Sequence, residues 1–459
     1  MGNCTSANTK KHQKKKNIIV SNSLRTSTLN NNTNNNNYNN YNYNNGIIQI
    51  QIHLNMTIIE SSTTKKVELL ISSLERLGKI FEILGINKKS DYDVQLNSGQ
   101  LLNDKPELTL YEVLLPYFPN GFKNNIDINL FYKGLDIPDD IKQAYINKNK
   151  IIGSAIFDNL DCFTIITYES ETGLIKPYFY NLKNNESFSK FNSFTAYCNA
   201  NGVMYISGGE SDQSDDFDKS VVKYKDFFCI DLKKLKEKEK NFKFQELTNL
   251  LEPRTWHSMI FVPNKYIFIV GGPTKSVEIY DIDLNYLFKD SELNEIRNEC
   301  TLCMVNNTYL YAFCGFLLHR TFNNTIEKCN LRRSVRKWEY VKYNLVGGIK
   351  FNPSFFAVSY FQDNQILLIG GNDSSEEKNK DYLIKIGNDE NYFDEISEFN
   401  VNQEKIGVFR DKLFTPIDIN TAINIPLIYG DNIQILKINL NNGLIEQKVI
   451  KDIFENQVF

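Results

Sequence analysis

Gly2 and Cys4, in the opening segment Met-Gly-Asn-Cys-Thr-Ser, have the residue types and spacing for covalent lipid attachment. Removal of Met1 would make Gly2 the amino terminus, and Ser6 stands at the position that an N-myristoyl acceptor requires. Cys4 is close enough to take a palmitoyl chain on its thiol. The expected chemistry is an amide-linked myristate at Gly2 and a thioester-linked palmitate at Cys4.

A basic run follows this acylation motif, and the first 45 residues contain no acidic residue. Its lysines are Lys10, Lys11, Lys14, Lys15 and Lys16. One myristoyl chain binds a bilayer only marginally, at about 10⁴ M⁻¹, whereas each lysine near an anionic leaflet adds about 1 kcal/mol. Motif, cysteine and lysines together predict a membrane anchor. The alternative interpretation is a disordered basic leader in which Gly2 occurs by chance.

Candidates for catalytic or metal chemistry are few. Only four histidines occur, and two of them, His257 and His319, fall in the C-terminal part of the chain. Cys300 and Cys303 form the single CxxC, but we expect them in a strand, where positions three apart point to opposite faces. The acidic run 212–218 lacks the glycine of a calcium loop. We therefore expect no catalytic residue, no metal site and no cofactor.

The eight cysteines are scattered without a disulfide framework, and no stretch is long and apolar enough for a signal peptide or a membrane span. These features predict a cytoplasmic protein that reaches the membrane only through its lipid anchor. Asparagine dominates residues 30–45, so residues 1–45 are predicted to form a disordered tail. The tyrosines of this tract follow the lysines instead of alternating with them, so we do not expect nucleic acid as a partner.

A folded unit is predicted from residue 46 to 135. Apolar residues alternate with polar ones from Ile48 to Leu54, which is the period of a half-buried strand, and 56–60 is interpreted as the returning strand. A helical stripe ended by Gly85 comprises Leu70, Leu74, Leu77, Phe81 and Leu84. Strands at 94–102 and 126–130 complete the element order of a β-grasp fold.

The segment Val94-Gln-Leu-Asn-Ser-Gly-Gln-Leu-Leu-Asn-Asp, followed by Leu108-Thr-Leu-Tyr-Glu-Val, resembles the ubiquitin-like domains. The first hairpin lacks the family's glycine, and residues 116–123 form an insertion. The unit has no free carboxyl-terminal Gly-Gly. The resemblance therefore implies a docking module and does not imply conjugation to other proteins.

After a linker at 136–150, the segment 151–455 is predicted to repeat one unit. In the clearest copy, two apolar runs joined at 263–265 are followed by Gly271-Gly272 and then by a third strand at 277–280. Apolar runs ended by glycine recur at 203–209, 266–272, 309–315, 366–371 and 426–430. A unit recurring about every 50 residues is typical of one blade of a β-propeller.

This copy resembles the kelch repeat. A further strand pair at 163–180 precedes the first glycine-ended run, so the resemblance implies about six blades. The repeats are degenerate, because Cys314 replaces the first glycine of one pair and Cys329 stands where the family has tyrosine. The matching positions, with structural roles in the family, are Gly208, Gly209, Arg254, His257, Gly271, Gly272, Tyr280, Gly315, Trp338, Gly370, Gly371 and Gly430.

The sequence thus predicts a mainly β protein: a kelch-type β-propeller preceded by a small α+β ubiquitin-like domain and a disordered tail. The expected function is that of a non-enzymatic scaffold or adaptor on the cytoplasmic face of a membrane, binding protein partners through propeller loops. The alternative is a substrate receptor of a ubiquitin ligase pathway. A third, weaker hypothesis is a copper oxidase, because some kelch propellers bind copper through two His and two Tyr, one crosslinked to Cys.

Overall fold

The computed structural model of the chain is mainly β and divides into two compact units, Met1–Leu135 and Asp136–Phe459. Each unit has its own hydrophobic core. The structure describes residues 18–19, 42–44, 47–49, 51–60, 63–72, 74–84, 86, 92–96, 102, 108–118, 125–132, 134–135, 137, 151–158, 162–181, 195–210, 222–235, 244–317, 321–348, 351, 356–361, 364–370, 381–387, 392–399, 415–416, 421–424, 433–439 and 445–450.

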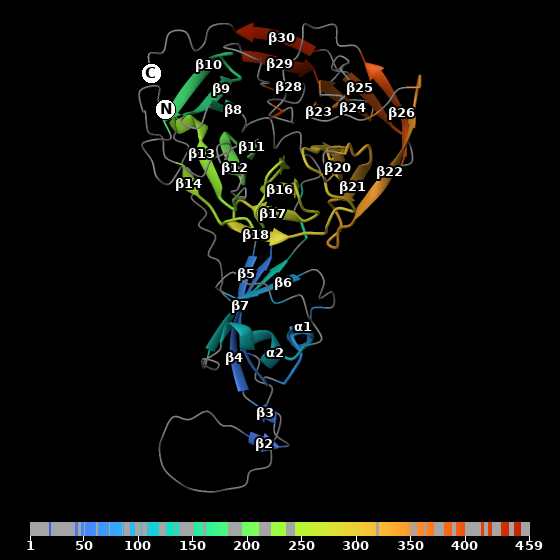
Figure 1. Cartoon of the computed structure of the whole chain (residues 1–459). Helices are drawn as coiled ribbons and strands as arrows, with labels where there is room; N and C mark the ends of the chain where they lie inside the picture. Colours follow the sequence, from blue (N-terminus) through green and yellow to red (C-terminus); the bar gives the residue numbers. More distant parts are fainter. Residues whose placement is uncertain are drawn as a thin grey trace, which may run out of the picture. The chain divides into compact units, whose positions relative to one another are not determined.

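The first unit is built on one mixed sheet (Figure 1). Its elements are β1 (Ile18–Ile19), β2 (Asn42–Asn44), β3 (Ile47–Gln49), β4 (Gln51–Glu60), β5 (Thr63–Ser72), α1 (Gly78–Ile83), β6 (Tyr92–Leu96), α2 (Leu110–Leu114), η2 (Leu115–Tyr117) and β7 (Asn125–Tyr132). The strand order of the sheet is β1-β5-β4-β7-β6, while β2 and β3 pair with each other. β4 is antiparallel to β5 and parallel to β7, and β1 extends the outer edge of β5 in the parallel direction.

Alternation along the strands buries one face of this sheet. Leu54 of β4, Leu69 of β5 and Ile128 of β7 point into a core that also takes up Ile80 of α1 and Leu110 of α2. The start of α2 is fixed by a capping box between its N-cap threonine and the glutamate three residues later. No helix in the described part of this chain is long and apolar enough to cross a bilayer.

The expected helical stripe was wrong at its start. Leu70 lies in β5 with 54% of its surface exposed, and Leu74 is also exposed, because the helix begins only at Gly78. The segment 56–60 continues β4 and is not a returning strand. The reason is a competing period: Leu69 and Ile71 reach the core at strand spacing, within a long antiparallel ladder between β4 and β5.

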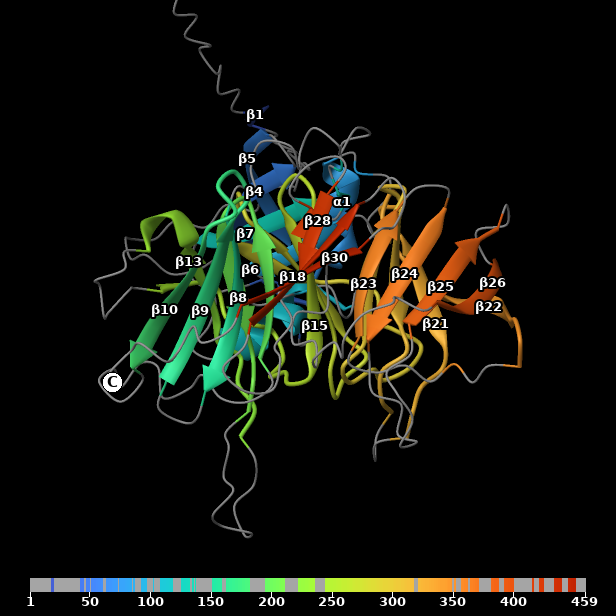
Figure 2. The same ribbon diagram turned by 90° about the horizontal axis from the view of Figure 1, so that it is seen from above.

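The second unit consists of groups of three or four antiparallel strands, and the strands of each group follow one another in sequence. Its first elements are β8 (Ile151–Asp158), β9 (Cys162–Glu169), β10 (Ile175–Asn181), β11 (Ala196–Ala200), β12 (Val203–Ser207), β13 (Phe227–Asp231), η5 (Leu232–Lys234), β14 (Gln245–Glu246), β15 (His257–Val262), β16 (Tyr266–Gly271), β17 (Val277–Asp281) and β18 (Tyr286–Lys289). They form the sheets β10-β9-β8, β11-β12-β13-β14 and β15-β16-β17-β18. Figure 2 shows β10, β9 and β8 side by side, and β8 was not anticipated from the sequence.

The remaining strands are β19 (Thr301–Val305), β20 (Tyr309–Phe313), β21 (Ile326–Asn330), β22 (Trp338–Leu345), β23 (Phe356–Phe361), β24 (Gln365–Gly370), β25 (Asp381–Ile386), β26 (Tyr392–Phe399), β27 (Thr415–Pro416), β28 (Thr421–Asn424), β29 (Ile433–Asn439) and β30 (Ile445–Ile450). β19 to β26 form one eight-stranded sheet, because β22 and β26, the last strands of two four-stranded groups, pair in parallel. β27 to β30 form a separate sheet.

Successive sheets of this unit pack face to face. β11, β15, β19 and β23, the first strands of their groups, lie next to one another in series. The strands β15, β16 and β17 are buried along their whole length, because neighbouring sheets cover both of their faces. One core cluster joins Tyr205 of β12 and Phe227 of β13 to Tyr280 of β17, with the Phe227 and Tyr280 ring centroids 4.9 Å apart. This packing fixes the loops that enter β15 and β19.

Candidate functional site

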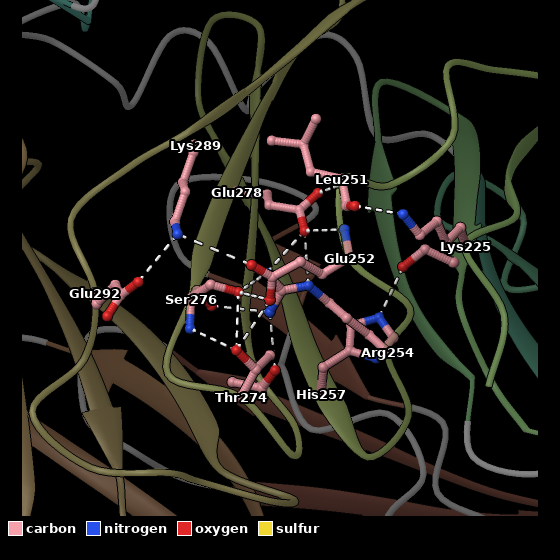
Figure 3. A network of polar contacts seen from close by, with 12 residues as sticks. Lys225, Leu251, Glu252, Arg254, His257, Thr274, Ser276, Glu278, Lys289 and Glu292 are labelled. Atoms are coloured by element: carbon pink, nitrogen blue, oxygen red, sulfur yellow. Dashed lines mark hydrogen bonds and ion pairs between the residues drawn. The ribbon is translucent and has the colours of Figure 1, made fainter. Parts of the chain in front are cut away.

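Arg254, in the loop that enters β15, is the centre of a buried polar network (Figure 3). Its Nε and Nη2 donate to Glu278 Oε1 at 3.0 and 2.8 Å. Nη1 donates to the carbonyl oxygens of Gly271 and Ser276 at 2.9 and 2.8 Å, and Nη2 also donates to Ser276 Oγ at 2.6 Å. A guanidinium has five N–H groups, and these five bonds engage all of them. We call Arg254, Glu278 and their hydrogen-bond partners the Arg254 frame.

The Glu278 carboxylate holds the entering loop from the other side. It accepts hydrogen bonds from the backbone N–H groups of Leu251 and Glu252, at 2.9 and 3.3 Å. Glu252 in turn accepts from the hydroxyls of Thr274 and Ser276, at 3.0 and 2.7 Å. Burial acts to raise the pKa of Glu252, but these hydroxyl bonds and the charge of nearby cations outweigh it and lower the pKa below 4.5. The Arg254 frame therefore favours the ionised form of the Glu252 carboxylate.

The next group of strands, β19 to β22, has an equivalent network. Its centre is Arg297, in the loop that leads into β19. Arg297 Nε donates to Glu327 Oε1 at 2.9 Å, and Nη1 donates to the carbonyl oxygens of Cys314 and Thr325. The backbone N–H groups of residues 294 and 295 donate to Glu327, as those of residues 251 and 252 donate to its counterpart. Glu295 accepts from the Thr325 hydroxyl at 2.9 Å. Two successive sheets thus position their entering loops with the same buried ion pair.

Glycines let each loop close against the preceding sheet. Gly208 and Gly271 have φ of 64° and 75°. A Cβ on Gly208 would meet the carbonyl oxygen of Arg254, and a Cβ on Gly271 would meet that of Arg297, each in the loop of the following group of strands. The next residue makes a backbone bond to the same oxygen, from Gly209 N to Arg254 O at 2.7 Å and from Gly272 N to Arg297 O at 2.9 Å. These contacts cross from one sheet to the next. A Cβ on Gly315 would likewise meet a carbonyl oxygen, that of Asn298 in the loop leading into its own group of strands.

His257, the first residue of β15, is buried in this packing. Its Nε2 lies 2.8 Å from the Ser207 hydroxyl, and its ring would be met by a Cβ on Gly208. Ser207 itself is fully buried and also lies 3.0 Å from the Met259 sulfur. The Ser–His pair therefore bridges two sheets in a position that solvent does not reach, which is a packing role.

Trp256 and Glu299 occupy the same place in the two repeated loops, two residues after Arg254 and Arg297 respectively. Both have left-handed backbone, with φ of 56° and 58°, which is uncommon for residues with a side chain. The Glu299 N–H donates to the Trp256 carbonyl oxygen at 2.6 Å. Trp256 is half-buried, whereas Glu299 is buried. The frames thus hold two dissimilar side chains at equivalent positions of adjacent loops.

The sequence singled out Arg254 but missed its partner Glu278 and the whole second frame. A signal was present, because Glu-x-Arg occurs at 252–254 and again at 295–297. Each copy is followed, after a glycine-ended strand, by a glutamate inside the next apolar run, Glu278 or Glu327. A charged residue in an apolar run indicates a buried partner, since an unpaired buried charge is costly.

Other residues noted from the sequence have packing positions. Tyr280 is buried and its hydroxyl donates to Asn285 at 2.9 Å, while Trp338 is buried opposite Cys329 in the β21/β22 ladder. Burial raises the pKa of the Cys303, Cys314 and Cys329 thiols well above the usual range, which keeps them protonated. Cys300 and Cys303 are both buried. Among the described residues, no cluster of three or more His, Cys, Asp or Glu residues could hold a metal ion.

Gly370 is the last residue of β24. The remaining predicted site residues lie outside the part of the chain that the structure describes, so their contacts are not part of this site: Gly2, Cys4, Lys10, Lys11, Lys14, Lys15, Lys16, Gly371 and Gly430. The same holds for His319.

No known family profile matches the sequence, and no curated protein is recognisably similar to it. Among solved structures, the protein titled "Structure of YjhT" is 9% identical to this chain. The match covers 66% of this chain and 99% of that one, with a TM-score of 0.41.

Proposed function

We propose that the chain is a non-enzymatic protein-binding scaffold tethered to the cytoplasmic face of a membrane. In this proposal the second unit is a kelch-type β-propeller that binds partners on its loops, and the first is a ubiquitin-like docking module. The observation that carries the proposal is the repeated frame, in which Arg254 and Arg297 hold adjacent loops in one conformation. Repetition of a loop-holding device, with different residues presented at Trp256 and Glu299, favours recognition of an extended partner surface.

The use of charge in the frames also favours a scaffold. Arg254 directs its N–H groups to one carboxylate, one hydroxyl and two main-chain carbonyls, all within the group of strands from β15 to β18 and its connecting loops. Buried charges with this arrangement fix backbone geometry, and the loops they fix supply the binding residues. The series of adjacent first strands, β11, β15, β19 and β23, supports a propeller arrangement of the sheets. In the first unit, a mixed sheet with β4 parallel to β7 and covered by two helices supports the ubiquitin-like assignment.

Partner binding at the repeated loops is tested by affinity purification of tagged full-length protein. Trp256→Ala should lose the partners that the parent recovers, because a half-buried aromatic at a held loop is the kind of residue that dominates interfaces. Leu284→Ala is the control, since this exposed residue lies in the turn between β17 and β18. Identical recoveries for parent and Trp256→Ala would rule out these loops. Recovery of ubiquitin ligase or proteasome subunits would favour the ligase-receptor alternative.

The anchor is tested by membrane fractionation. Gly2→Ala should move the protein from the membrane pellet to the soluble fraction, because the myristoyl amide does not form on alanine. Cys4→Ser should give an intermediate result that raised salt shifts further, since the lysine attraction is screened within a Debye length and acyl burial is not. An unchanged membrane fraction for Gly2→Ala would mean that the leader is only a basic tail.

A further inference from the structure

The loop between β21 and β22, residues 331–337, contains three arginines, one lysine and no acidic residue, and we call it the basic loop. Arg332, Arg333 and Lys337 are exposed. Val335, which lies among them, has 55% of its surface exposed, more than any other large apolar side chain in the described part of the chain. The basic loop therefore presents three positive charges and one apolar side chain to solvent.

The backbone of the basic loop is held by contacts within the second unit. Arg336 is buried, and its Nε donates to Asp290 Oδ1 and Oδ2 at 3.0 and 2.9 Å. Its Nη1 donates to the Arg333 carbonyl oxygen at 3.2 Å. At the start of the loop, the Leu331 N–H donates to the Thr308 carbonyl oxygen at 2.8 Å. One cation of the loop thus has a structural role, and it fixes the backbone from which the exposed ones project.

Two of the exposed cations are not neutralised by the protein around them. Arg333 and Lys337 form no ion pair with any residue whose side chain the structure describes. The acidic residue that follows in β22, Glu339, lies opposite a lysine, Lys328, in the β21/β22 ladder. The positive charge of the basic loop therefore remains available to an anionic partner.

We propose that the basic loop contacts an anionic lipid surface, with Arg333 and Lys337 at the headgroups and Val335 directed into the interface. This inference rests on the proposed membrane tether and extends it, because the second unit then touches the bilayer itself. Cations beside an exposed apolar side chain suit a membrane interface, where charge attraction and apolar burial act together. A loop whose backbone is already held also loses little conformational entropy on binding.

The test measures sedimentation of full-length acylated protein with phosphatidylcholine vesicles, with and without phosphatidylserine. Arg333→Gln/Lys337→Gln should weaken binding to the phosphatidylserine vesicles by about tenfold, because two charges near the leaflet are removed. Arg333→Lys should bind as the parent does, since a lipid surface requires a charge and not the planar guanidinium. Parent-like binding of the double variant would overturn the proposal.

The charge-matched control is Lys223→Gln/Lys275→Gln. Both lysines are exposed, and they lie in the connections from β12 to β13 and from β16 to β17. In an antiparallel group, such a connection lies at the opposite end from the loop between the third and fourth strands. Successive groups share that end, because Gly209 and Gly272 bond there to the next entering loop. The control should keep its binding, and a loss equal to that of the loop variant would reduce the effect to net charge and overturn the proposal.

Val335 gives a second readout that does not depend on affinity. Val335→Trp places an indole at the exposed position, and its emission, after subtraction of the parent spectrum, should shift to shorter wavelength with phosphatidylserine vesicles. Bound protein with unshifted emission would place the basic loop away from the bilayer and overturn the proposal. Vesicle binding that needs Gly2 but neither Arg333 nor Lys337 overturns this inference alone, whereas a parent that binds neither kind of vesicle overturns the tether as well.

Discussion

At Arg254 a full positive charge serves to hold backbone in place. The side chain is completely buried, and its hydrogen bonds join the entering loop to the end of β16 and the start of β17. Replacing a buried ion pair with apolar groups is often tolerated, whereas removing one partner leaves an uncompensated charge in a low-dielectric interior. The frame should therefore be sensitive to single changes and much less sensitive to paired ones.

Arg254→Met should lower the free energy of unfolding of the second unit by about 3–5 kcal/mol, because Glu278 is left buried without its cation. Denaturant unfolding measures this loss. Arg254→Met/Glu278→Met should recover much of it. Lys79→Met, which breaks an exposed ion pair, is the comparison and should cost much less. A single variant as stable as the parent would refute the structural role of the frame.

Gly271 and Gly173 separate backbone strain from steric conflict. Both have positive φ, 75° and 67°, but a Cβ on Gly271 would lie 2.6 Å from the Arg297 carbonyl oxygen, whereas Gly173 has open space around it. Gly173→Val should therefore cost only the conformational term, about 1–3 kcal/mol. Gly271→Val should cost that amount and a further 1–3 kcal/mol or so from overpacking. Equal melting temperatures for the two variants would contradict the close approach of Gly271 to the Arg297 carbonyl.

At the scale of elements, the sequence predicted strands better than it predicted what connects them. The prediction of a strand at 277–280 is confirmed by β17, and the run ended by Gly271 is confirmed by β16, because apolar runs and glycine stops are local signals. The frames were missed because Arg297 and Glu327 meet only when loop and strand have been brought together. Leu70 was misassigned because its helical spacing coincided with a strand whose neighbours alternate.

The parallel pairing of β22 and β26 is another feature that no local pattern indicated, because the two strands are far apart in the sequence. This pairing joins two four-stranded groups into a single sheet. The two groups also contact each other through side chains, because Phe393 of β26 packs against Tyr311 and Phe313 of β20. The two groups should therefore lose structure together.

Phe393→Ala should reveal this coupling. The side chain is fully buried, so its loss should cost about 3–5 kcal/mol. Amide hydrogen exchange should rise in β20 and β21 as well as in β24 and β25, since the cavity is shared between the groups. Leu345→Ala, an exposed change on β22, serves as the control. Exchange confined to β24 and β25 would mean that the groups are independent despite the ladder.

At the scale of the whole molecule, the chain has two units, and the core clusters formed by the described residues each lie within one of them. A core that is closed within its own unit should unfold as its own cooperative transition. The chain should therefore show two transitions that respond to different substitutions.

Ile128→Ala should lower the stability of the first unit by about 2–5 kcal/mol, because this fully buried residue lies in β7 within its core. Calorimetry should show one transition shifted downward and the other unmoved, and Arg254→Met should give the reverse pattern. A shift of both transitions by either variant would mean that the two cores unfold as one.

The backbone bond from Gly209 to Arg254 has a consequence for how the protein is made. The strands β11 and β12 are synthesised before Arg254 has been added to the chain, so the Gly209 N–H lacks its native acceptor at that stage. At about 5–20 residues per second, the wait lasts on the order of several seconds. During translation, therefore, each newly emerged sheet remains open along one side until the loop of its successor arrives, and this is the interval in which a chaperone has most to protect.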